Sequence, residues 1–274
     1  MLLKGIAALS AILALVFALN GAGWMALVYF AACYALLFLV ALGWMALILS
    51  FVDIDREQEQ DSKFYRFFMY LYIDVLIVLV RAKIHTQGLE KLPGEGRFLL
   101  VCNHQQMADP GVILSCMKKS QLAFISKQEN RTMPVIGKFM HKIMCQPLDR
   151  NNDRQALRVI LKCIQMLKED MVSVGVFPEG TRSKDGKVHP FRSGVFKIAQ
   201  KAEVPIVVCT INGTAPLFRN LKKLKRTHIH LHVVDVIPAA ELKGKTTGQV
   251  ADQVYEMMIA DLGEEFRALP ENQE

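Results

Sequence analysis

A histidine and an aspartate stand five positions apart in the segment Asn103–Pro110, directly after the apolar run 98–101. If a tight turn follows a strand here, the Asp109 carboxylate can hydrogen-bond one nitrogen of the His104 imidazole and leave the other free. General-base catalysis on a hydroxyl group needs a base with a pKa near neutral and a group that orients it, and this pair supplies both. Asp109 followed by Pro110 is also typical of a helix start with aspartate as N-cap, so the pair alone does not establish catalysis.

A second polar segment, residues 177–183, follows the apolar run 172–176. Its proline and glycine predict a turn, after which Arg182 is presented. An arginine in a fixed loop suits bidentate phosphate recognition, although a solvated surface turn has the same composition. Lys127 and Arg150 also follow strand-like segments. We therefore expect the three cations and the His–Asp pair to converge if these strands are neighbours.

These segments need elements that bring strand ends together. Short apolar runs alternate with amphipathic segments from about residue 83 onward. We predict strands at 83–87, 97–103, 121–126, 173–178, 205–211 and 228–236, and helices at 109–118, 133–143, 151–169, 193–202 and 246–267. This alternation is typical of an α/β fold with a mixed, largely parallel sheet flanked by helices. Binding sites in such sheets gather at the carboxyl ends of strands.

The helix predicted from residue 151 has the clearest pattern. Asn151, Asn152 and Asp153 are suitable caps for its first turn. Apolar residues recur along it at helical spacing, and we expect them to form its buried face: Leu157, Ile160, Leu161, Ile164 and Leu167.

The N-terminal part of the chain is strongly apolar. No Asp, Glu, Lys or Arg stands between Gly5 and Val52, which is long enough for two membrane spans, and turn formers at 20–23 divide the run. A cleaved signal peptide is the alternative interpretation of the first part. We predict helices at about 3–19 and 24–51, and three regions: a transmembrane helical hairpin at 1–52, a linker with an interfacial helix at 53–82, and one α/β domain at 83–274. The helix of the linker is expected at 64–80, where it lies at the membrane interface or covers the sheet rather than forming a third span.

Charge and cysteine usage narrow the class of protein. Residues 1–82 hold 5 of the 33 Lys and Arg residues and 6 of the 26 Asp and Glu residues. Residues 83–274 therefore hold 28 basic and 20 acidic residues, a net charge of +8. A basic domain beside a membrane predicts an anionic partner, such as phospholipid head groups or a phosphorylated substrate. No nucleic-acid-binding motif is visible, and we expect no nucleic-acid partner. The six cysteines lie in apolar stretches without paired spacing, which favours reduced core residues and a cytosolic domain.

Three alternating histidines, His228, His230 and His232, share one face of a predicted strand. Alternating histidines can bind a metal, but an exposed polar strand face accounts for them as well. No carboxylate-rich motif accompanies them, so we expect no metal site.

Taken together, the polar segments resemble the 1-acyl-sn-glycerol-3-phosphate O-acyltransferases, the lysophosphatidate acyltransferases. The resemblance rests on four blocks whose order and spacing hold across about 83–215: Asn103-His104-x-x-x-x-Asp109, Lys127 through Gly137 to Arg150-Asn151, Phe177-Pro178-Glu179-Gly180-Thr181-Arg182-Ser183, and Val204-Pro205-Ile206-Val207. Two positions depart from the family pattern, since Gln106 stands where many members have serine and Val208 where many have a second proline. These departures leave acyl-donor and head-group preference open.

The resemblance implies a glycerolipid acyltransferase fold for the domain at 83–274 and transfer of a fatty acyl group from acyl-CoA or acyl carrier protein to the free hydroxyl of lysophosphatidate. It implies that His104 is the general base and that Asp109 orients it. It assigns the substrate phosphate to Lys127, Arg150 and Arg182, and supporting roles to Asn103, Glu179, Gly180 and Thr181. No cofactor beyond the acyl-donor co-substrate is implied.

Two other functions remain open from the sequence. One is an acyltransferase for glycerol-3-phosphate or another lysophospholipid, and the other is a non-catalytic membrane module that binds anionic lipid. A lipid-binding module needs no base–carboxylate pair, so the motif favours the enzyme. We expect the protein in a membrane, a bacterial cell membrane, with its catalytic domain on the cytoplasmic side.

Overall fold

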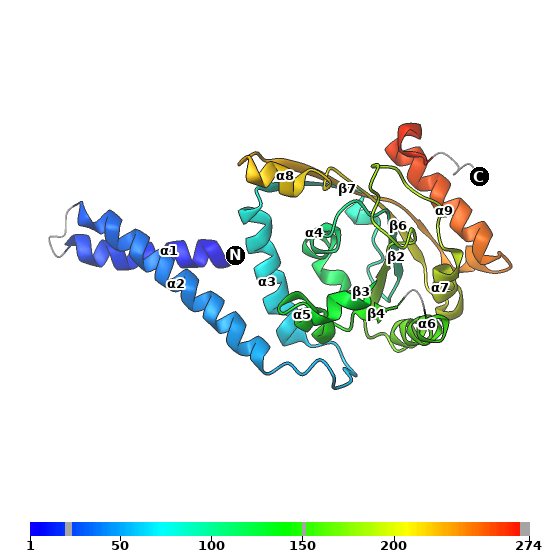
Figure 1. Cartoon of the computed structure of the whole chain (residues 1–274), viewed down its shortest axis with the longest axis horizontal. Coiled ribbons are helices and arrows are strands. Elements are labelled where there is room, and N and C mark those ends of the chain that lie inside the picture. Colours follow the sequence, from blue (N-terminus) through cyan, green and yellow to red (C-terminus); the bar gives the residue numbers. More distant parts are fainter. Residues whose placement is uncertain (20–23, 150–151, 269–274) are drawn as a thin grey trace.

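The computed structural model describes residues 1–19, 24–149 and 152–268. Two N-terminal helices, α1 (Leu2–Phe17) and α2 (Met25–Ser50), lie side by side and project from a rounded body of strands and helices (Figure 1). Both helices were predicted close to these bounds. The turn formers that separate them in the sequence lie outside the described residues.

Seven strands form one sheet in the described part of the chain, in the order β1-β7-β6-β2-β5-β3-β4. They are β1 (Ala82–Gln87), β2 (Leu99–Cys102), β3 (Leu122–Lys127), β4 (Gln146–Leu148), β5 (Ser173–Val176), β6 (Ile206–Asn212) and β7 (Thr227–Ile237). All neighbouring pairs are parallel except β6 and β7. The predicted mixed, largely parallel sheet is therefore confirmed, and β2 and β5 lie side by side as the convergence of the polar segments requires.

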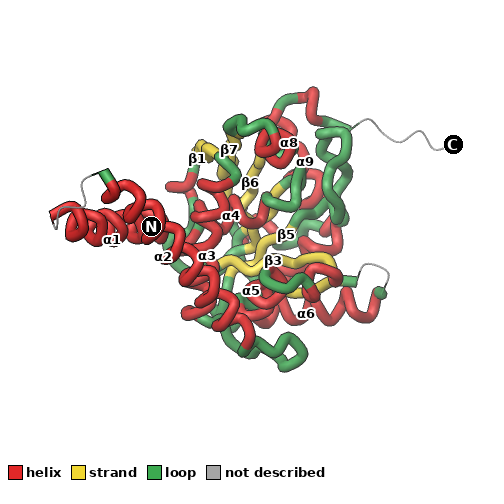
Figure 2. The backbone as a smooth tube through the Cα atoms, turned by 60° about the vertical axis from the view of Figure 1, so that its left-hand side comes forward, coloured by secondary structure: helices red, strands yellow, loops and turns green. Residues whose placement is uncertain are grey.

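Helices cover both faces of this sheet (Figures 1 and 2). One face carries α3 (Lys63–Leu79), α4 (Asp109–Cys116) and α5 (Ile136–Lys142), and the other carries α6 (Asp153–Lys168), α7 (Lys197–Ala202) and α9 (Thr247–Leu262). Every residue of β2 and β5 is buried. Cover on both faces explains why these strands read as continuous apolar runs rather than as alternating ones.

Two short elements escaped the sequence analysis, β4 and the helix α8 (Leu217–Lys222). Neither is long enough to show a hydrophobic period. The helix predicted at 246–267 ends earlier than expected, because Gly263 adopts a φ of 109° that terminates α9. Short 3-10 turns complete the described chain: Leu89–Lys91, Lys118–Ser120, Gln128–Thr132, Ser193–Phe196, Ala239–Leu242 and Glu264–Phe266.

The buried face of α6 differs from the predicted one. Asn152 caps this helix as expected, by accepting the Gln155 N–H at 3.1 Å. Leu157 and Leu161, however, are 57% and 55% exposed. The buried stripe consists of Val159, Cys163, Met166 and the predicted Leu167, and the predicted Ile160 and Ile164 are partly buried beside it. The prediction was wrong for the two leucines because α6 carries apolar residues on two faces, and only contact with the sheet selects one.

Helix α3 occupies the segment predicted as an interfacial or sheet-covering helix. It packs against α4, α5 and β1, and it buries Met69, Tyr72 and Val75. It thus covers the sheet as one of the two expected alternatives. Its outward face exposes Phe64 and Phe67.

Of the helices described, α2 alone has the length and apolar composition needed to cross a membrane. Helix α1 is equally apolar but has 16 residues, fewer than the roughly 20 that span a bilayer core. The structure therefore has the two packed apolar helices that the hairpin prediction requires, but only α2 is long enough to span a membrane.

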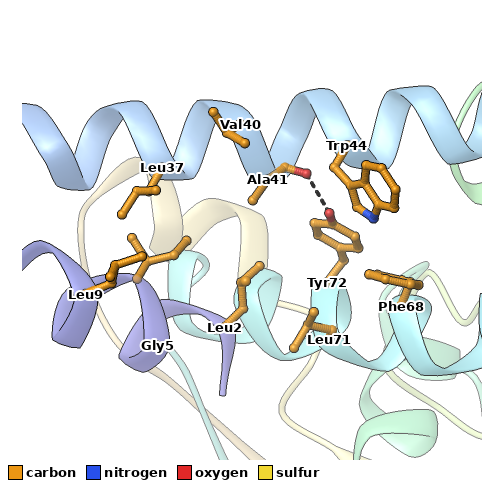
Figure 3. Close-up of a pocket in the computed structure, with 11 residues that line it drawn as sticks. Leu2, Gly5, Leu9, Leu37, Val40, Ala41, Trp44, Phe68, Leu71 and Tyr72 are labelled. Carbon is orange, nitrogen blue, oxygen red and sulfur yellow. Dashed lines mark hydrogen bonds between the residues drawn. The ribbon is translucent and has the colours of Figure 1, made fainter.

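The two N-terminal helices meet α3 across an apolar groove of about 440 Å³ (Figure 3). Two tyrosine hydroxyls of α3 fasten α2 beside it, since Tyr72 donates to the Ala41 carbonyl at 2.6 Å and Tyr65 to the Ile48 carbonyl at 3.0 Å. These bonds satisfy the hydroxyl groups, so the groove presents hydrocarbon side chains from all three helices.

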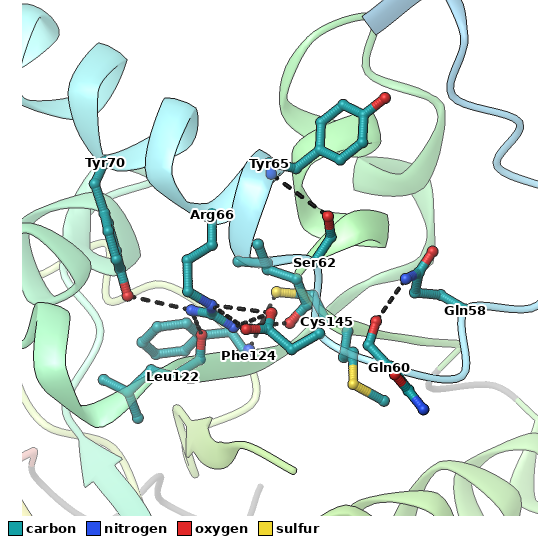
Figure 4. A network of polar contacts seen from close by, with 12 residues as sticks. Gln58, Gln60, Ser62, Tyr65, Arg66, Tyr70, Leu122, Phe124 and Cys145 are labelled. Carbon is teal, nitrogen blue, oxygen red and sulfur yellow. Dashed lines mark hydrogen bonds and ion pairs between the residues drawn. The ribbon is translucent and has the colours of Figure 1, made fainter. Parts of the chain in front are cut away.

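A buried ion pair fastens the start of α3 to the body (Figure 4). The Arg66 guanidinium donates to the Asp61 carboxylate at 2.7 Å, to the carbonyl oxygens of Leu122 at 2.9 Å and Ile143 at 3.3 Å, and to the Tyr70 hydroxyl at 3.2 Å. One side chain therefore joins the linker, α3, β3 and the end of α5.

Candidate active site

The loop between β2 and α4 folds the Asp109 carboxylate back beneath His104. Asp109 Oδ2 accepts hydrogen bonds from His104 Nδ1 at 2.8 Å and from the backbone N–H groups of Gln105 at 2.7 Å and Gln106 at 2.8 Å. Asp109 is fully buried, whereas the His104 side chain retains 16% exposure. The structure thus brings together the two residues predicted to act as a pair.

The alternative N-cap interpretation of Asp109 is wrong. Helix α4 begins at Asp109 itself with Ala108 as N-cap, and no side chain caps it. The carboxylate bonds to N–H groups that precede the helix rather than to those of its first turn. Asp109 is therefore committed to the loop and to His104, while Pro110 occupies the first turn as predicted.

The pairing fixes which imidazole nitrogen can act as a base. An ionised carboxylate only accepts hydrogen bonds, so in the neutral imidazole Nδ1 carries the proton and Nε2 holds the lone pair. His104 Nε2 has no hydrogen-bond partner among the described residues. The arrangement can therefore remove a proton from a hydroxyl group at Nε2 while Asp109 stabilises the resulting imidazolium.

An aromatic stack holds the imidazole plane. The Phe177 ring lies on His104 with its centroid 4.1 Å away and the planes 21° apart, and Phe124 stacks behind it at 5.5 Å. Phe177 belongs to the third sequence block, but its residue type and position in that block predict no role. Only the adjacency of β2 and β5 indicates that the residue after β5 contacts the residue two positions after β2.

Glu179 braces the His104 loop instead of facing solvent. Its Oε1 accepts the His104 backbone N–H at 2.7 Å, and its Oε2 accepts the His189 N–H at 3.1 Å. In return the Ser183 N–H donates to the His104 carbonyl at 2.8 Å. Burial raises the pKa of Glu179 to about 7, although these two N–H groups act in the opposite direction. The predicted supporting role of Glu179 thus has a specific geometry.

The raised pKa predicts a pH dependence of stability. Folded Glu179 keeps its proton up to about pH 7, whereas its ordinary pKa is 4.5. Between these values the folded state binds more protons, so the unfolding free energy falls as pH rises, by about 1–3 kcal/mol. We expect Glu179→Gln to lack this slope in denaturation midpoints measured from pH 4.5 to 7. Parallel profiles for the two proteins would contradict the assignment.

The turn after Glu179 presents exposed cations. Gly180 has a φ of 74°, a conformation that favours glycine, and a Cβ there would require the exposed Arg192 side chain, whose Nε would lie 2.8 Å away, to move. Thr181, Arg182 and Arg192 are exposed. Neither arginine forms an ion pair with any residue that the structure describes. Arg192 lies beside this turn although the sequence analysis assigned it no role.

Lys127 and Arg150 are the other two cations predicted to bind the phosphate, and the structure describes only Lys127. Lys127 ends β3, which neighbours β5, so it lies at the same edge of the sheet as the His–Asp pair. Its ammonium group is exposed and forms an ion pair with Glu129 at 2.7 Å. Arg150 falls outside the described residues, so its predicted contact with a phosphate stays a prediction.

Two amides tie the catalytic loop to β6. Asn103 Nδ2 donates to the Ile211 carbonyl at 2.9 Å, and its Oδ1 accepts the Ile211 N–H at 2.8 Å. Gln105 Oε1 accepts the Gly213 N–H at 3.1 Å. Asn103 therefore ties the loop after β2 to β6, and its supporting role in the reaction stays a prediction. Gln105 was missed, because nothing in the sequence links it to a strand more than a hundred positions later.

The alternating histidines lie on β7, which is next to the edge strand β1 and is separated from β2 by β6. His228 and His230 are exposed on β7, as predicted, and their rings stack on His85 of β1 at 5.3 and 4.8 Å. His232 Nδ1 pairs with Asp261 at 2.6 Å. In the described chain, no three His, Cys, Asp or Glu side chains are grouped to hold a metal ion.

Residues 83–212 match the family model described as Acyltransferase. The chain carries an acyltransferase domain. The matched residues contain β2 to β6, and with them His104, Asp109, Phe177 and Glu179. The resemblance to acyltransferases is thus supported by a family-model match over the residues that contain the four sequence blocks.

Relatives of the acyltransferase domain include two curated proteins. The chain is 38% identical over 156 residues to the chloroplastic 1-acyl-sn-glycerol-3-phosphate acyltransferase of Brassica napus, covering 57% of this chain and 44% of that protein. It is 28% identical over 176 residues to the 1-acyl-sn-glycerol-3-phosphate acyltransferase of Escherichia coli K12, covering 62% of this chain and 70% of that protein. The chain thus spans less than half of the chloroplast relative.

A solved structure extends the similarity beyond the acyltransferase domain. The crystal structure of the 1-acyl-sn-glycerophosphate acyltransferase from Thermotoga maritima has a TM-score of 0.64 and 26% sequence identity to this chain. The match covers 84% of this chain and 90% of that one. It exceeds residues 83–212 and so includes elements outside the acyltransferase domain.

Proposed function

We propose that this protein is a membrane-bound acyltransferase that moves a fatty acyl group from acyl-CoA or acyl carrier protein to the sn-2 hydroxyl of lysophosphatidate, giving phosphatidate. The observation that carries the proposal is the 2.8 Å His104–Asp109 hydrogen bond, which leaves His104 Nε2 without a partner among the described residues. The names of the curated relatives support lysophosphatidate as the acceptor.

The reaction follows from the position of the proton. His104 Nε2 removes the hydroxyl proton as the substrate oxygen attacks the thioester carbonyl, and Asp109 stabilises the imidazolium. The C–O bond forms, the C–S bond breaks, and the imidazolium returns the proton to the leaving thiolate. No covalent acyl-enzyme is needed, because the acceptor hydroxyl takes the place that a serine has in a hydrolase.

The acceptor phosphate is assigned to the exposed cations at the same edge of the sheet. Arg182 is the foremost candidate, because it follows the loop that Glu179 and Ser183 fasten to His104. Lys127 and Arg150 are the further candidates, since a phosphate dianion needs more than one charged partner. Release of Lys127 from Glu129 would be part of binding.

We place the protein in a membrane, with the catalytic domain on the cytoplasmic side. Helix α2 supplies a segment of spanning length, and the exposed aromatic residues of α3 suit a lipid interface. Four free cysteines, Cys102, Cys145, Cys163 and Cys209, are buried in the domain, as reduced core residues are in the cytosol.

One acceptor panel tests the function. Purified full-length protein is given palmitoyl-CoA, or separately palmitoyl-acyl carrier protein, with lysophosphatidate, glycerol-3-phosphate, lysophosphatidylcholine or monoacylglycerol in turn, and lipid products are separated. We expect transfer to lysophosphatidate. Transfer to another acceptor alone would change the substrate assignment, and absence of transfer to all four would leave a lipid-binding module.

Replacing Arg182 tests the phosphate assignment. Because a hydrogen bond to a charged group contributes about 1.5–3 kcal/mol, Arg182→Ala should lower kcat/KM for lysophosphatidate about 10- to 100-fold. The rate with monoacylglycerol, which lacks the phosphate, should change little. Lys243→Ala, which removes an exposed cation elsewhere on the domain, is the control. An equal loss with both acceptors would show that Arg182 does not read the phosphate.

A further inference from the structure

The outward face of α6 has the composition of a protein-binding surface. Four residues at i, i+3, i+4 and i+7 form one stripe on it: Arg154, Leu157, Arg158 and Leu161. All four side chains are exposed, the two leucines by 57% and 55%. Large apolar side chains flanked by arginines are enriched at protein interfaces, whereas a merely solvated helix face carries polar residues.

The charge of this face is positive and largely unbalanced. Neither Arg154 nor Arg158 forms a hydrogen bond or an ion pair with the residues that the structure describes. Lys168 adds an exposed cation in the last turn, and Lys162 lies at one side, paired with Glu57 of the linker at 3.2 Å. The acidic residues of the helix stand at its two ends. A partner must therefore be acidic.

The stripe begins at the carboxyl edge of the sheet, the edge that also holds the His–Asp pair, and it lies away from the free end of the α1–α2 pair. The first turn of α6 is tied to the carboxyl edge of the sheet, since Gln155 donates to Gln128 Oε1 at 3.2 Å and accepts the Asp149 N–H at 3.0 Å. Gln128 directly follows Lys127, one of the candidate phosphate ligands. Figures 1 and 2 both place α6 away from the free end of the α1–α2 pair, although the linker that follows α2 reaches α6 through the ion pair of Glu57 with Lys162.

We propose that the stripe formed by Arg154, Leu157, Arg158 and Leu161 docks an acidic carrier protein that presents the acyl group as a thioester. This inference rests on the proposed function and names the donor that the function leaves open. The leucines contact apolar side chains of the carrier, the arginines pair with its carboxylates, and the thioester arm reaches His104 past the start of α6.

Two other occupants fit less well. A second copy of this chain would bring the same arginines against one another across a symmetric interface, which opposes association. A membrane surface would have to lie away from the free end of the α1–α2 pair, which includes the helix of spanning length. Positive charge and exposed leucines in that position favour a soluble acidic protein.

The test compares two donors that carry the same acyl chain, palmitoyl-acyl carrier protein and palmitoyl-CoA, with full-length protein in detergent. For Arg154→Glu/Arg158→Glu we expect KM for the carrier-bound donor to rise at least about tenfold, with kcat and the KM for palmitoyl-CoA unchanged. Leu157→Ser/Leu161→Ser should raise the same KM without reversing charge. Lys201→Glu/Lys243→Glu, which makes an equal charge change elsewhere, should leave both donors unaffected.

Each remaining outcome is decisive. An unchanged KM for the carrier in both stripe variants overturns the docking site. Wild-type transfer from palmitoyl-CoA with none from the carrier protein also overturns it, while the proposed function stands. No transfer from either donor means that the function itself has failed. If Arg154→Glu/Arg158→Glu instead abolishes a stimulation of palmitoyl-CoA transfer by phosphatidylglycerol, with KM for the carrier unchanged, the face binds lipid and the inference is wrong.

Discussion

His104→Asn is expected to fold normally and to lose acyl transfer by a factor of about 10²–10⁴, the range that a general base contributes. The asparagine amide can replace Nδ1 as donor to Asp109 Oδ2, so the buried carboxylate keeps a partner, but nothing replaces the Nε2 lone pair. Asp109 Oδ1 already has no partner among the described residues, which makes retention of this bond important for folding. Initial rates with lysophosphatidate and palmitoyl-CoA measure the loss.

The matched control is His230→Asn on β7, whose imidazole is exposed and lies outside the candidate site. This variant should keep its rate. His104→Ala should lose as much activity as His104→Asn and be less stable, because it leaves Asp109 without the imidazole. A folded His104→Asn protein with near-normal rates would exclude His104 as the base.

Arg66→Met is expected to lower the unfolding free energy by about 3–5 kcal/mol, the largest effect on stability that the structure indicates. Removing the guanidinium leaves the Asp61 carboxylate, which is 9% exposed, without its ion-pair partner. It also removes the donors to the Leu122 and Ile143 carbonyls, which are buried hydrogen bonds. The loss is measured as a shift in the denaturant midpoint at which the α/β body of the detergent-solubilised protein unfolds.

Two further variants separate burial from pairing. Lys118→Met breaks a surface pair with Asp74, whose side chains are 41% and 29% exposed, and should cost no more than about 1 kcal/mol. Arg66→Met combined with Asp61→Leu should be more stable than Arg66→Met alone, because no buried charge is left unpaired. A loss of 1 kcal/mol or less in Arg66→Met would contradict the role assigned to the pair.

The sequence predicted correctly those features that depend on a single short segment. The apolar runs at β2 and β5 predict strands buried on two faces, and both strands are fully buried. Asn152 predicts the start of α6, since a cap needs only its own helix. The spacing of His104 and Asp109 requires just one tight turn to bring them together, and the structure shows that turn.

Other features depend on contacts between distant segments, and local patterns misread them. Asp109 before Pro110 is a good N-cap by type, yet its carboxylate turns toward His104, Gln105 and Gln106. Leu157 and Leu161 have the spacing of a core face, yet the sheet contacts a different stripe of α6. In both cases two local arrangements are physically acceptable, and packing selects one.

The sequence by itself determined the groups on which the proposed chemistry depends: a base–carboxylate pair, a loop with Arg182, and an apolar N-terminal segment. It determined them because residue types and short spacings are sufficient for each. Tertiary structure decided the order of the strands, and with it the contacts of Phe177 and Glu179 with His104. Strand order follows from which faces bury the most apolar surface together, a property of the whole chain that no single segment contains.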